Sequence, residues 1–85
     1  MSLVLDRKLE NKSTNRLRLL DLSAVGPEKG VARLIERALE LRASDVFLVT
    51  NEQHVGVQVR LRGQIEKLCI LDADQGRRYV AHIRN

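Results

Sequence analysis

The stretch that decides the fold runs from residue 30 to residue 63 and reads GVARLIERALELRASDVFLVTNEQHVGVQVRLRG. Apolar residues in its first part recur every three or four positions, which places them on one side of an α-helix and leaves charged residues on the other. We therefore expect this helix to lie with its apolar side on a sheet. Gly26-Pro27-Glu28 gives the helix its start, because proline already holds a helical φ and glutamate suits the positive end of the helix dipole. The apolar set consists of Val31, Leu34, Ile35, Ala38 and Leu41.

Two strands are expected after a short junction at Ala43, Ser44 and Asp45. Residues 46–49 are apolar throughout, which is typical of an interior strand that is covered on both faces. Between residues 55 and 62, valine or leucine alternates with glycine, glutamine or arginine, so one face of this second strand should be buried while the other faces water or a partner. The short connection between the strands makes them an antiparallel hairpin.

A third strand is predicted over residues 65–71. A two-residue turn at Gly63 and Gln64 would lead into it from the second strand. The alternation of apolar residues in the third strand is interrupted, and a bulge near Glu66 and Lys67 would reconcile its two halves.

A final helix follows the third strand. Asp72 has the side chain of a helix N-cap, and Gln75 stands where it would complete a capping box. The predicted fold is an α+β two-layer sandwich in the order α-β-β-β-α, in which a three-stranded antiparallel sheet packs against flanking helices. Residues 1–26 are predicted to be an N-terminal linker or edge segment, and residues 27–85 the α+β domain.

Composition limits the classes of function. A chain of 85 residues with 44% hydrophobic residues is expected to form one small domain of modest stability. Its net charge of +4 comes from basic residues scattered among acids. This pattern is typical of a solvated surface, so a nucleic acid is not an expected partner. The sequence has no long apolar run and no leader segment, and it predicts neither a membrane span nor a signal peptide.

Few residues are placed for catalysis. The sequence lacks a glycine-rich phosphate loop that ends in Lys-Ser or Lys-Thr. His54 and His82 have no Cys or His neighbour at metal-ligand spacing, so no metal site is predicted. The single cysteine, Cys69, lies in an apolar strand pattern, which favours a small buried side chain in a protein from a reducing compartment. Ser44 beside Asp45 is interpreted as a local cap at the corner between helix and strand.

Arg60 and Arg62 are the candidate binding residues. They stand two positions apart on the outward face of the second strand, about 7 Å from each other along it. A guanidinium group offers paired donors in a fixed fork, which suits phosphate or carboxylate oxygens. The alternative interpretation is ordinary exposure to solvent.

Three runs of the sequence resemble one protein family. LIERALELRASDVFLV, VGVQVRLRG and the closing YVAHIRN are similar to the domain that precedes the motor in the type II secretion and type IV pilus assembly ATPases. In that family an apolar helix leads into Ala-Ser-Asp-Ile-His-Ile-Glu-Pro, a strand reads Val-Arg-Tyr-Arg-Ile-Asp-Gly, and Arg-Ile-Lys follows later. The similarity covers residues 27–85 in the same order.

The sequence departs from the family pattern at several positions. Phe47, Val49 and Thr50 stand where the family has His, Glu and Pro. On the second strand, Gln58 replaces the first family arginine and Arg62 replaces the aspartate. Only Arg60 therefore matches a family arginine.

The resemblance implies a PAS-like, N2-type domain that is non-catalytic by itself and rides on a RecA-like motor domain. Such a domain assists nucleotide-dependent closure of subunits in a hexameric motor for protein secretion or pilus assembly. The resemblance gives Arg60 and, more weakly, Arg62 the role of contacting nucleotide or a neighbouring subunit.

For the parent polypeptide, the resemblance implies an ATPase that uses ATP and Mg²⁺ and acts in the cytoplasm or at the periphery of the inner membrane. Its partners would be the motor domain, the neighbouring subunits and the inner-membrane secretion machinery. The alternative is a free-standing protein–protein interaction or regulatory module with the same fold.

Overall fold

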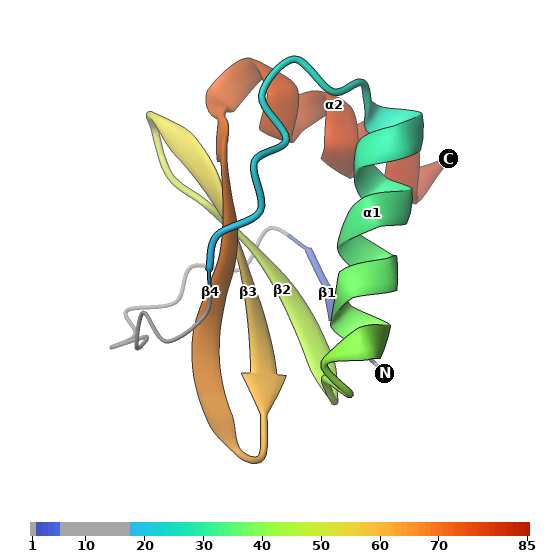
Figure 1. The fold of residues 1–85 in the computed structure, drawn as a ribbon. Coiled ribbons are helices and arrows are strands. Elements are labelled where there is room, and N and C mark those ends of the chain that lie inside the picture. The colour runs from blue at the N-terminus through green and yellow to red at the C-terminus, as the bar shows by residue number, and fades with distance from the viewer. Residues whose placement is uncertain (1, 6–17) are drawn as a thin grey trace.

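The computed structural model describes residues 2–5 and 18–85. Residues 6–17, which belong to the predicted linker or edge segment, lie outside the described residues. The elements are β1 (Ser2–Val4), α1 (Pro27–Glu40), β2 (Asp45–Thr50), β3 (His54–Leu61), β4 (Gln64–Asp72) and α2 (Ala73–Arg84). The strands form a single curled sheet, with α1 along one side of it and α2 across one end (Figure 1).

The sheet differs from the predicted one. It has four strands in the order β1-β2-β3-β4, and β1 runs parallel to β2 while the other neighbours are antiparallel. The prediction of a three-stranded antiparallel sheet in the order α-β-β-β-α was therefore wrong, although the fold remains α+β. The missed strand, β1, has only 3 residues, which is too short for an alternating pattern to appear in the sequence. Its parallel pairing requires a long crossover to β2, and that crossover contains α1.

The hydrophobic core lies between the sheet and the two helices. Leu34 and Ala38 of α1 and Tyr79 of α2 pack in one cluster with the inward-facing valines of β3. These valines are Val55, Val57 and Val59. The helix stripe predicted from the sequence thus faces the sheet as expected.

The prediction that β2 is an interior strand is also confirmed. Val46, Phe47 and Leu48 are all buried, although successive side chains of a strand point to opposite faces. Asp45–Thr50 pairs with β3 along its whole length, and its first three residues pair with β1 on the other side.

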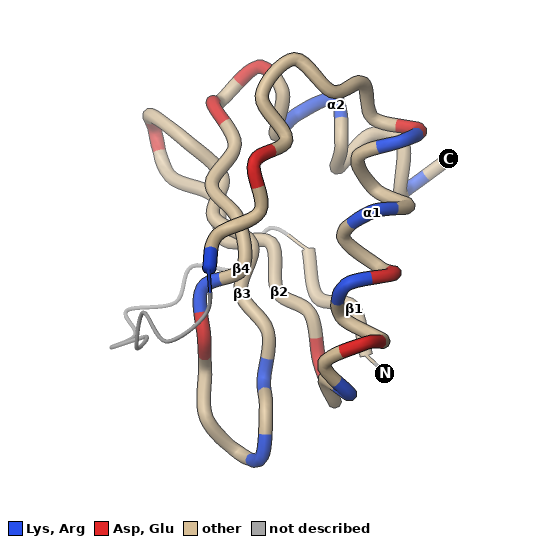
Figure 2. Tube along the Cα trace, viewed as in Figure 1, with Lys and Arg blue, Asp and Glu red and all other residues tan. Residues whose placement is uncertain are grey.

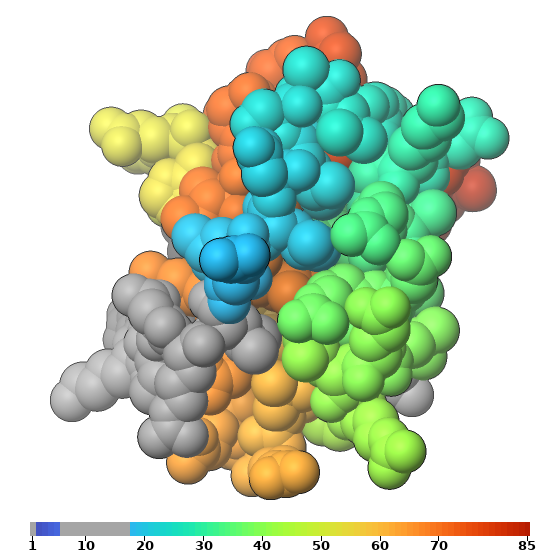
Figure 3. Space-filling model, viewed as in Figure 1, coloured from blue at the N-terminus to red at the C-terminus, as the bar shows by residue number. Residues whose placement is uncertain are grey.

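The segment before α1 completes the core between α1 and β4. Leu20 forms an isolated parallel bridge with Cys69, and its N–H donates to the carbonyl of Leu68 at 2.8 Å. Leu22, two residues later, is buried in the core cluster. The space-filling view shows this segment packed between α1 and β4 (Figure 3).

Two hydrogen-bonding side chains of α2 hold the same segment. The hydroxyl of Tyr79 donates to the carbonyl of Val25 at 2.8 Å, and the amide of Gln75 donates to the carbonyls of Leu22 and Val25. The Asp72 N-cap is confirmed, because its side chain accepts from the Gln75 N–H at 2.7 Å. The predicted capping box was wrong in its other half, since the Gln75 side chain reaches across to the segment before α1 instead of back to Asp72.

Gly30 allows the close contact between the helices. A Cβ placed on Gly30 would lie 1.8 Å from the Tyr79 hydroxyl oxygen and 2.1 Å from the ring carbon that bears it. Glycine is a poorer helix former than alanine by about 1 kcal/mol, but the structure gives Gly30 a packing role.

The β3–β4 hairpin turns one residue earlier than predicted. Leu61 pairs with Gln64, so the two-residue turn is formed by Arg62 and Gly63, with φ of 52° and 81°. Positive φ at both positions is the geometry of the primed turns that match the twist of a hairpin. The bulge in β4 is also displaced from Glu66 and Lys67, because Val57 pairs with Cys69 and Gln58 with Lys67, which leaves Leu68 as the extra residue.

Candidate functional site

Arg60 lies near the end of β3 on the sheet face opposite the helices. Its neighbour Val59 is fully buried toward the helices, so Arg60 points the other way by strand alternation. The Arg60 side chain is 44% exposed. The outward orientation predicted from the sequence is therefore what the structure shows.

Three residues of the α1–β2 junction and β2 surround Arg60. Its Nε lies 3.5 Å from Oδ2 of Asp45, the residue directly opposite it in the sheet register. Its guanidinium carbon lies 5.5 Å from the centre of the Phe47 ring, a distance typical of a cation–π contact. The Ser44 hydroxyl donates to Asp45 Oδ2 at 2.9 Å, and the Ser44 N–H donates to the Arg60 carbonyl at 3.0 Å. We call these four residues, Ser44, Asp45, Phe47 and Arg60, the Arg60 cluster.

Arg62 does not lie on the strand beside Arg60. It is the first residue of the hairpin turn and is exposed. The structure therefore does not bring the two arginines together as neighbours on one strand face. Because Arg62 takes a positive φ in the turn, strand alternation does not fix the direction of its side chain.

The Arg60 cluster brings together residues from two of the three runs in which the sequence resembles the secretion and pilus ATPases. The Ala-Ser-Asp junction contributes Ser44 and Asp45, and the strand that ends in Arg-Leu-Arg-Gly contributes Arg60. Sequence reasoning missed Asp45 and Phe47 as contacts of Arg60. Counting back along both strands of the hairpin would have placed Asp45 opposite Arg60, because paired residues of an antiparallel hairpin keep a constant sum of residue numbers.

The remaining reactive side chains have structural roles. Cys69 is fully buried, and this burial raises the pKa of its thiol to about 11, so it is not a thiolate nucleophile at neutral pH. The prediction that Cys69 is a small buried hydrophobe is confirmed. His54 begins β3, where its ring lies 3.1 Å from the Asn51 amide. Within residues 2–5 and 18–85, no three potential metal ligands lie together.

Gln58 lies on the outward face of β3, as predicted, but it is buried. It is only 8% exposed, and its Oε1 has no hydrogen-bond partner among the described residues. Gln58 and Lys67 line a hollow of about 180 Å³ on the face of the sheet away from the helices. On the outward face of β3, Arg60 is thus exposed, Gln58 is buried, and His54 and Gly56 are half-buried.

A larger groove lies at the other end of the molecule, between α2 and the end of the β2–β3 hairpin. Its volume is about 450 Å³. Thr50 and Val55 form one side, and one face of α2 forms the other. The α2 residues in this face are Arg77, Val80, Ala81 and Arg84. No motif in the sequence indicated this groove, because charged residues such as Arg77 and Arg84 are usually solvated on the outer side of a helix.

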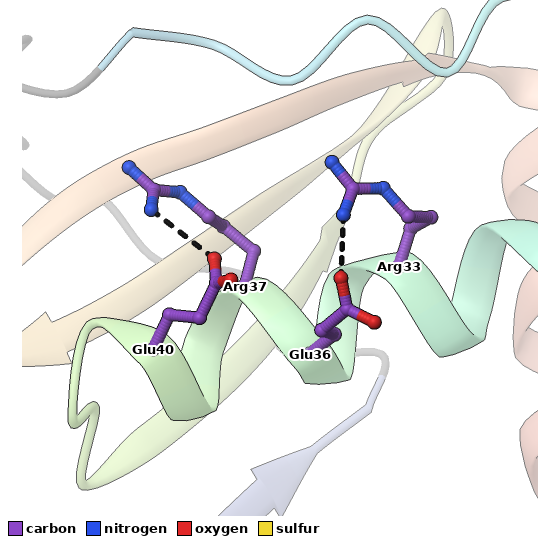
Figure 4. A network of polar contacts seen from close by, with 4 residues as sticks. All are labelled: Arg33, Glu36, Arg37 and Glu40. Atoms are coloured by element: carbon purple, nitrogen blue, oxygen red, sulfur yellow. Dashed lines mark hydrogen bonds and ion pairs between the residues drawn. The ribbon is translucent and has the colours of Figure 1, made fainter.

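Exposed charges on the helices are largely balanced locally. On α1, Arg33 pairs with Glu36 at 2.6 Å and Arg37 pairs with Glu40 at 3.3 Å (Figure 4). Along the chain trace, residues of both charges occur on this helix (Figure 2). Such exposed pairs contribute little to stability, but they place a carboxylate beside each of the two arginines.

Comparisons with known proteins returned no relatives: no family model, no curated protein and no solved structure matches the chain. In the part of the chain that the structure describes, neither helix is long and apolar enough to cross a membrane.

Proposed function

We propose that the chain is the non-catalytic domain that accompanies the motor in a type II secretion or type IV pilus assembly ATPase. In this proposal the domain assists the nucleotide-dependent closure of subunits in a hexameric motor. The observation that carries the proposal is the Arg60 cluster, in which the Ala-Ser-Asp junction and the strand arginine meet at an exposed end of the sheet.

The chemistry of the cluster supports a contact with an anion. The Arg60 guanidinium is exposed on one side and offers more N–H donors than Asp45 can accept. Phosphate oxygens of a nucleotide and carboxylates of a neighbouring subunit both suit such donors. Arg62 would serve as a second cation nearby only if the turn carries its side chain toward the same ligand.

Binding of ATP and Mg²⁺ would belong to the motor domain. The sequence of this chain has no glycine-rich phosphate loop, and its described residues hold no cluster of potential metal ligands. We therefore assign this chain the role of closing over nucleotide held elsewhere and passing that closure to adjacent subunits. The motor domain and neighbouring subunits are the proposed partners, and the cytoplasmic side of the inner membrane is the proposed location.

The first test is to read the coding sequence downstream of Asn85. A glycine-rich loop ending in Lys-Ser or Lys-Thr in the same reading frame is expected. Absence of such a loop would overturn the proposal in favour of a free-standing interaction module. Sedimentation of the 85-residue chain would then show whether the chain associates with itself.

The second test is made in the whole polypeptide. Arg60→Ala is expected to lower ATP turnover by about tenfold or more, because an arginine that stabilises phosphate charge contributes strongly to such reactions. Arg33→Ala, on the exposed side of α1, is the matched control and should leave turnover unchanged. Equal turnover in the two variants would remove Arg60 from the nucleotide site.

A further inference from the structure

Two contacts of different kinds constrain the Arg60 side chain. Asp45 lies beside Nε, along one edge of the planar guanidinium, while the Phe47 ring lies within cation–π distance of its central carbon. The edge contact and the ring contact use different parts of the group. The contact with Asp45 is made through Nε, so the two terminal nitrogens are the atoms that remain for a ligand.

Asp45 is itself held in place. Its Oδ2 accepts from the Ser44 hydroxyl at 2.9 Å, and its side chain is only 23% exposed. Its backbone is fixed by pairing with β1 on one side and β3 on the other. The carboxylate thus offers Arg60 a contact of defined position, whereas most surface carboxylates move freely.

The contact between Arg60 and Asp45 adds little to the stability of the fold. Pairs with one partner this exposed typically contribute a small free energy, because solvent screens the charges and two side chains lose freedom. We therefore expect the contact to matter for the orientation of Arg60. An arginine that is already ordered loses less conformational entropy when it binds a ligand.

We propose that Asp45 and Phe47 are positioning residues that hold the Arg60 guanidinium with its two terminal nitrogens directed outward, ready to bind a phosphate group. This inference rests on the proposed function, in which Arg60 contacts nucleotide. Ser44 acts through Asp45 by fixing the carboxylate. The ligand class is a phosphate oxyanion, since two parallel N–H donors match two of its oxygens.

The experiment compares Asp45→Glu with the wild-type 85-residue chain. This substitution keeps the charge and moves the carboxylate by one methylene, so it separates position from electrostatic attraction. Asp74→Glu is the matched control, because Asp74 forms exposed ion pairs with Arg77 and Arg78 on α2. Arg60→Lys identifies the NMR signal of the Arg60 Nε–H in ¹⁵N-labelled protein by its loss.

The first measurement is the position of that Nε–H signal. Asp45→Glu is expected to move the signal to the range of solvated arginines, while Asp74→Glu leaves it in place. The thermal midpoint of unfolding should be the same in the wild type, Asp45→Glu and Asp74→Glu. A signal that does not move in Asp45→Glu would overturn the positioning role, whether or not any anion binds.

The second measurement is the affinity for inorganic pyrophosphate, followed by NMR titration. Asp45→Glu should weaken binding by about 2- to 12-fold, the range expected when one long side chain must be ordered on binding. Unchanged affinity in Asp45→Glu would overturn the proposal. If the wild-type chain binds pyrophosphate no more tightly than Arg60→Ala does, the anion contact in the proposed function is contradicted. The Nε–H signal would in that case still decide the positioning role.

Discussion

Gly30→Ala should destabilise the protein, although alanine is the better helix former. Helix propensity alone favours alanine over glycine by about 1 kcal/mol. The new methyl group, however, would lie 1.8 Å from the Tyr79 hydroxyl oxygen and 2.6 Å from another ring carbon, so the ring or the helix must move. Overpacking of this kind costs roughly 1–3 kcal/mol in a close-packed core.

Displacement of Tyr79 adds a second penalty. The Tyr79 hydroxyl donates to the carbonyl of Val25 and accepts from the Gln75 amide, and both contacts are part-buried. A buried polar group that loses its partner costs roughly 1–3 kcal/mol. The two penalties together amount to about 4 kcal/mol, and subtraction of the propensity gain of about 1 kcal/mol leaves an expected net loss of about 3 kcal/mol in the free energy of unfolding.

The assay is thermal and urea unfolding of the 85-residue chain, followed by circular dichroism. A loss of this size lowers Tm by roughly 12–24 °C in a domain of fewer than one hundred residues. Gly56→Ala is the matched control, because a Cβ at Gly56 meets no atom within 4 Å. It should leave Tm unchanged or raise it slightly.

A double substitution separates the two penalties. Tyr79→Phe removes the oxygen nearest to the new methyl group, so Gly30→Ala should cost less in the Tyr79→Phe background than in the wild type. An increase in Tm on Gly30→Ala alone would refute the reasoning, because it would mean that helix propensity outweighs the contact between the helices.

Three further outcomes are expected. Gly76→Ala should lower the urea midpoint, because its Cβ would lie 2.2 Å from a methyl carbon of Val55, and Val55→Ala in the same chain should recover part of the loss. Asp72→Ala should cost about 1 kcal/mol of unfolding free energy through loss of the N-cap bond to Gln75, measured by urea unfolding; an unchanged midpoint would show that the cap is not needed. Burial raises the pKa of Cys69 from 9.0 to about 11, so the thiol of the unfolded chain loses its proton at lower pH than that of the folded chain. The free energy of unfolding should therefore fall as pH rises from about 9 to about 11, by up to roughly 3 kcal/mol. Cys69→Ala should flatten that part of the pH profile, and an equally steep decline in this variant would assign it to other groups.

Much of the fold could be predicted because its strongest patterns are local. The three- and four-residue spacing in α1 and the unbroken apolar run in β2 each report directly on burial. β1 could not be found in this way, since alternation is recognisable only over four or more residues and β1 has 3. Its pairing with β2 depends on a contact between residues more than forty positions apart, which one sequence does not reveal.

The errors at finer scale have a common physical origin. Gln75 was assigned to the capping box because that motif is local, yet its amide satisfies carbonyls at Leu22 and Val25 that no local motif could supply. In the β3–β4 hairpin, the glycine was correctly placed in the turn, but the turn needs two residues with positive φ, and the preceding residue, Arg62, takes the other place.

The candidate site was predictable only in part. Strand alternation was enough to place Arg60 on the outward face, since its neighbours are valine and leucine. The same alternation placed Gln58 on the outward face, where it lies, but alternation could not predict its burial, because burial of that face depends on what covers the sheet. The partners of Arg60 come from across the hairpin, so they required the strand register as well as the pattern of one strand.

The hydrogen bonds from α2 to the segment before α1 affect the order in which parts of the protein can fold. Val25 receives its hydrogen bond from a residue 54 positions later, and Leu22 from one 53 positions later. During synthesis, both carbonyls must wait until Gln75 and Tyr79 have emerged from the ribosome before their native donors exist. Contacts of such long range slow folding and make it concerted, so a nascent chain that stops short of α2 should remain a target for chaperones and proteases.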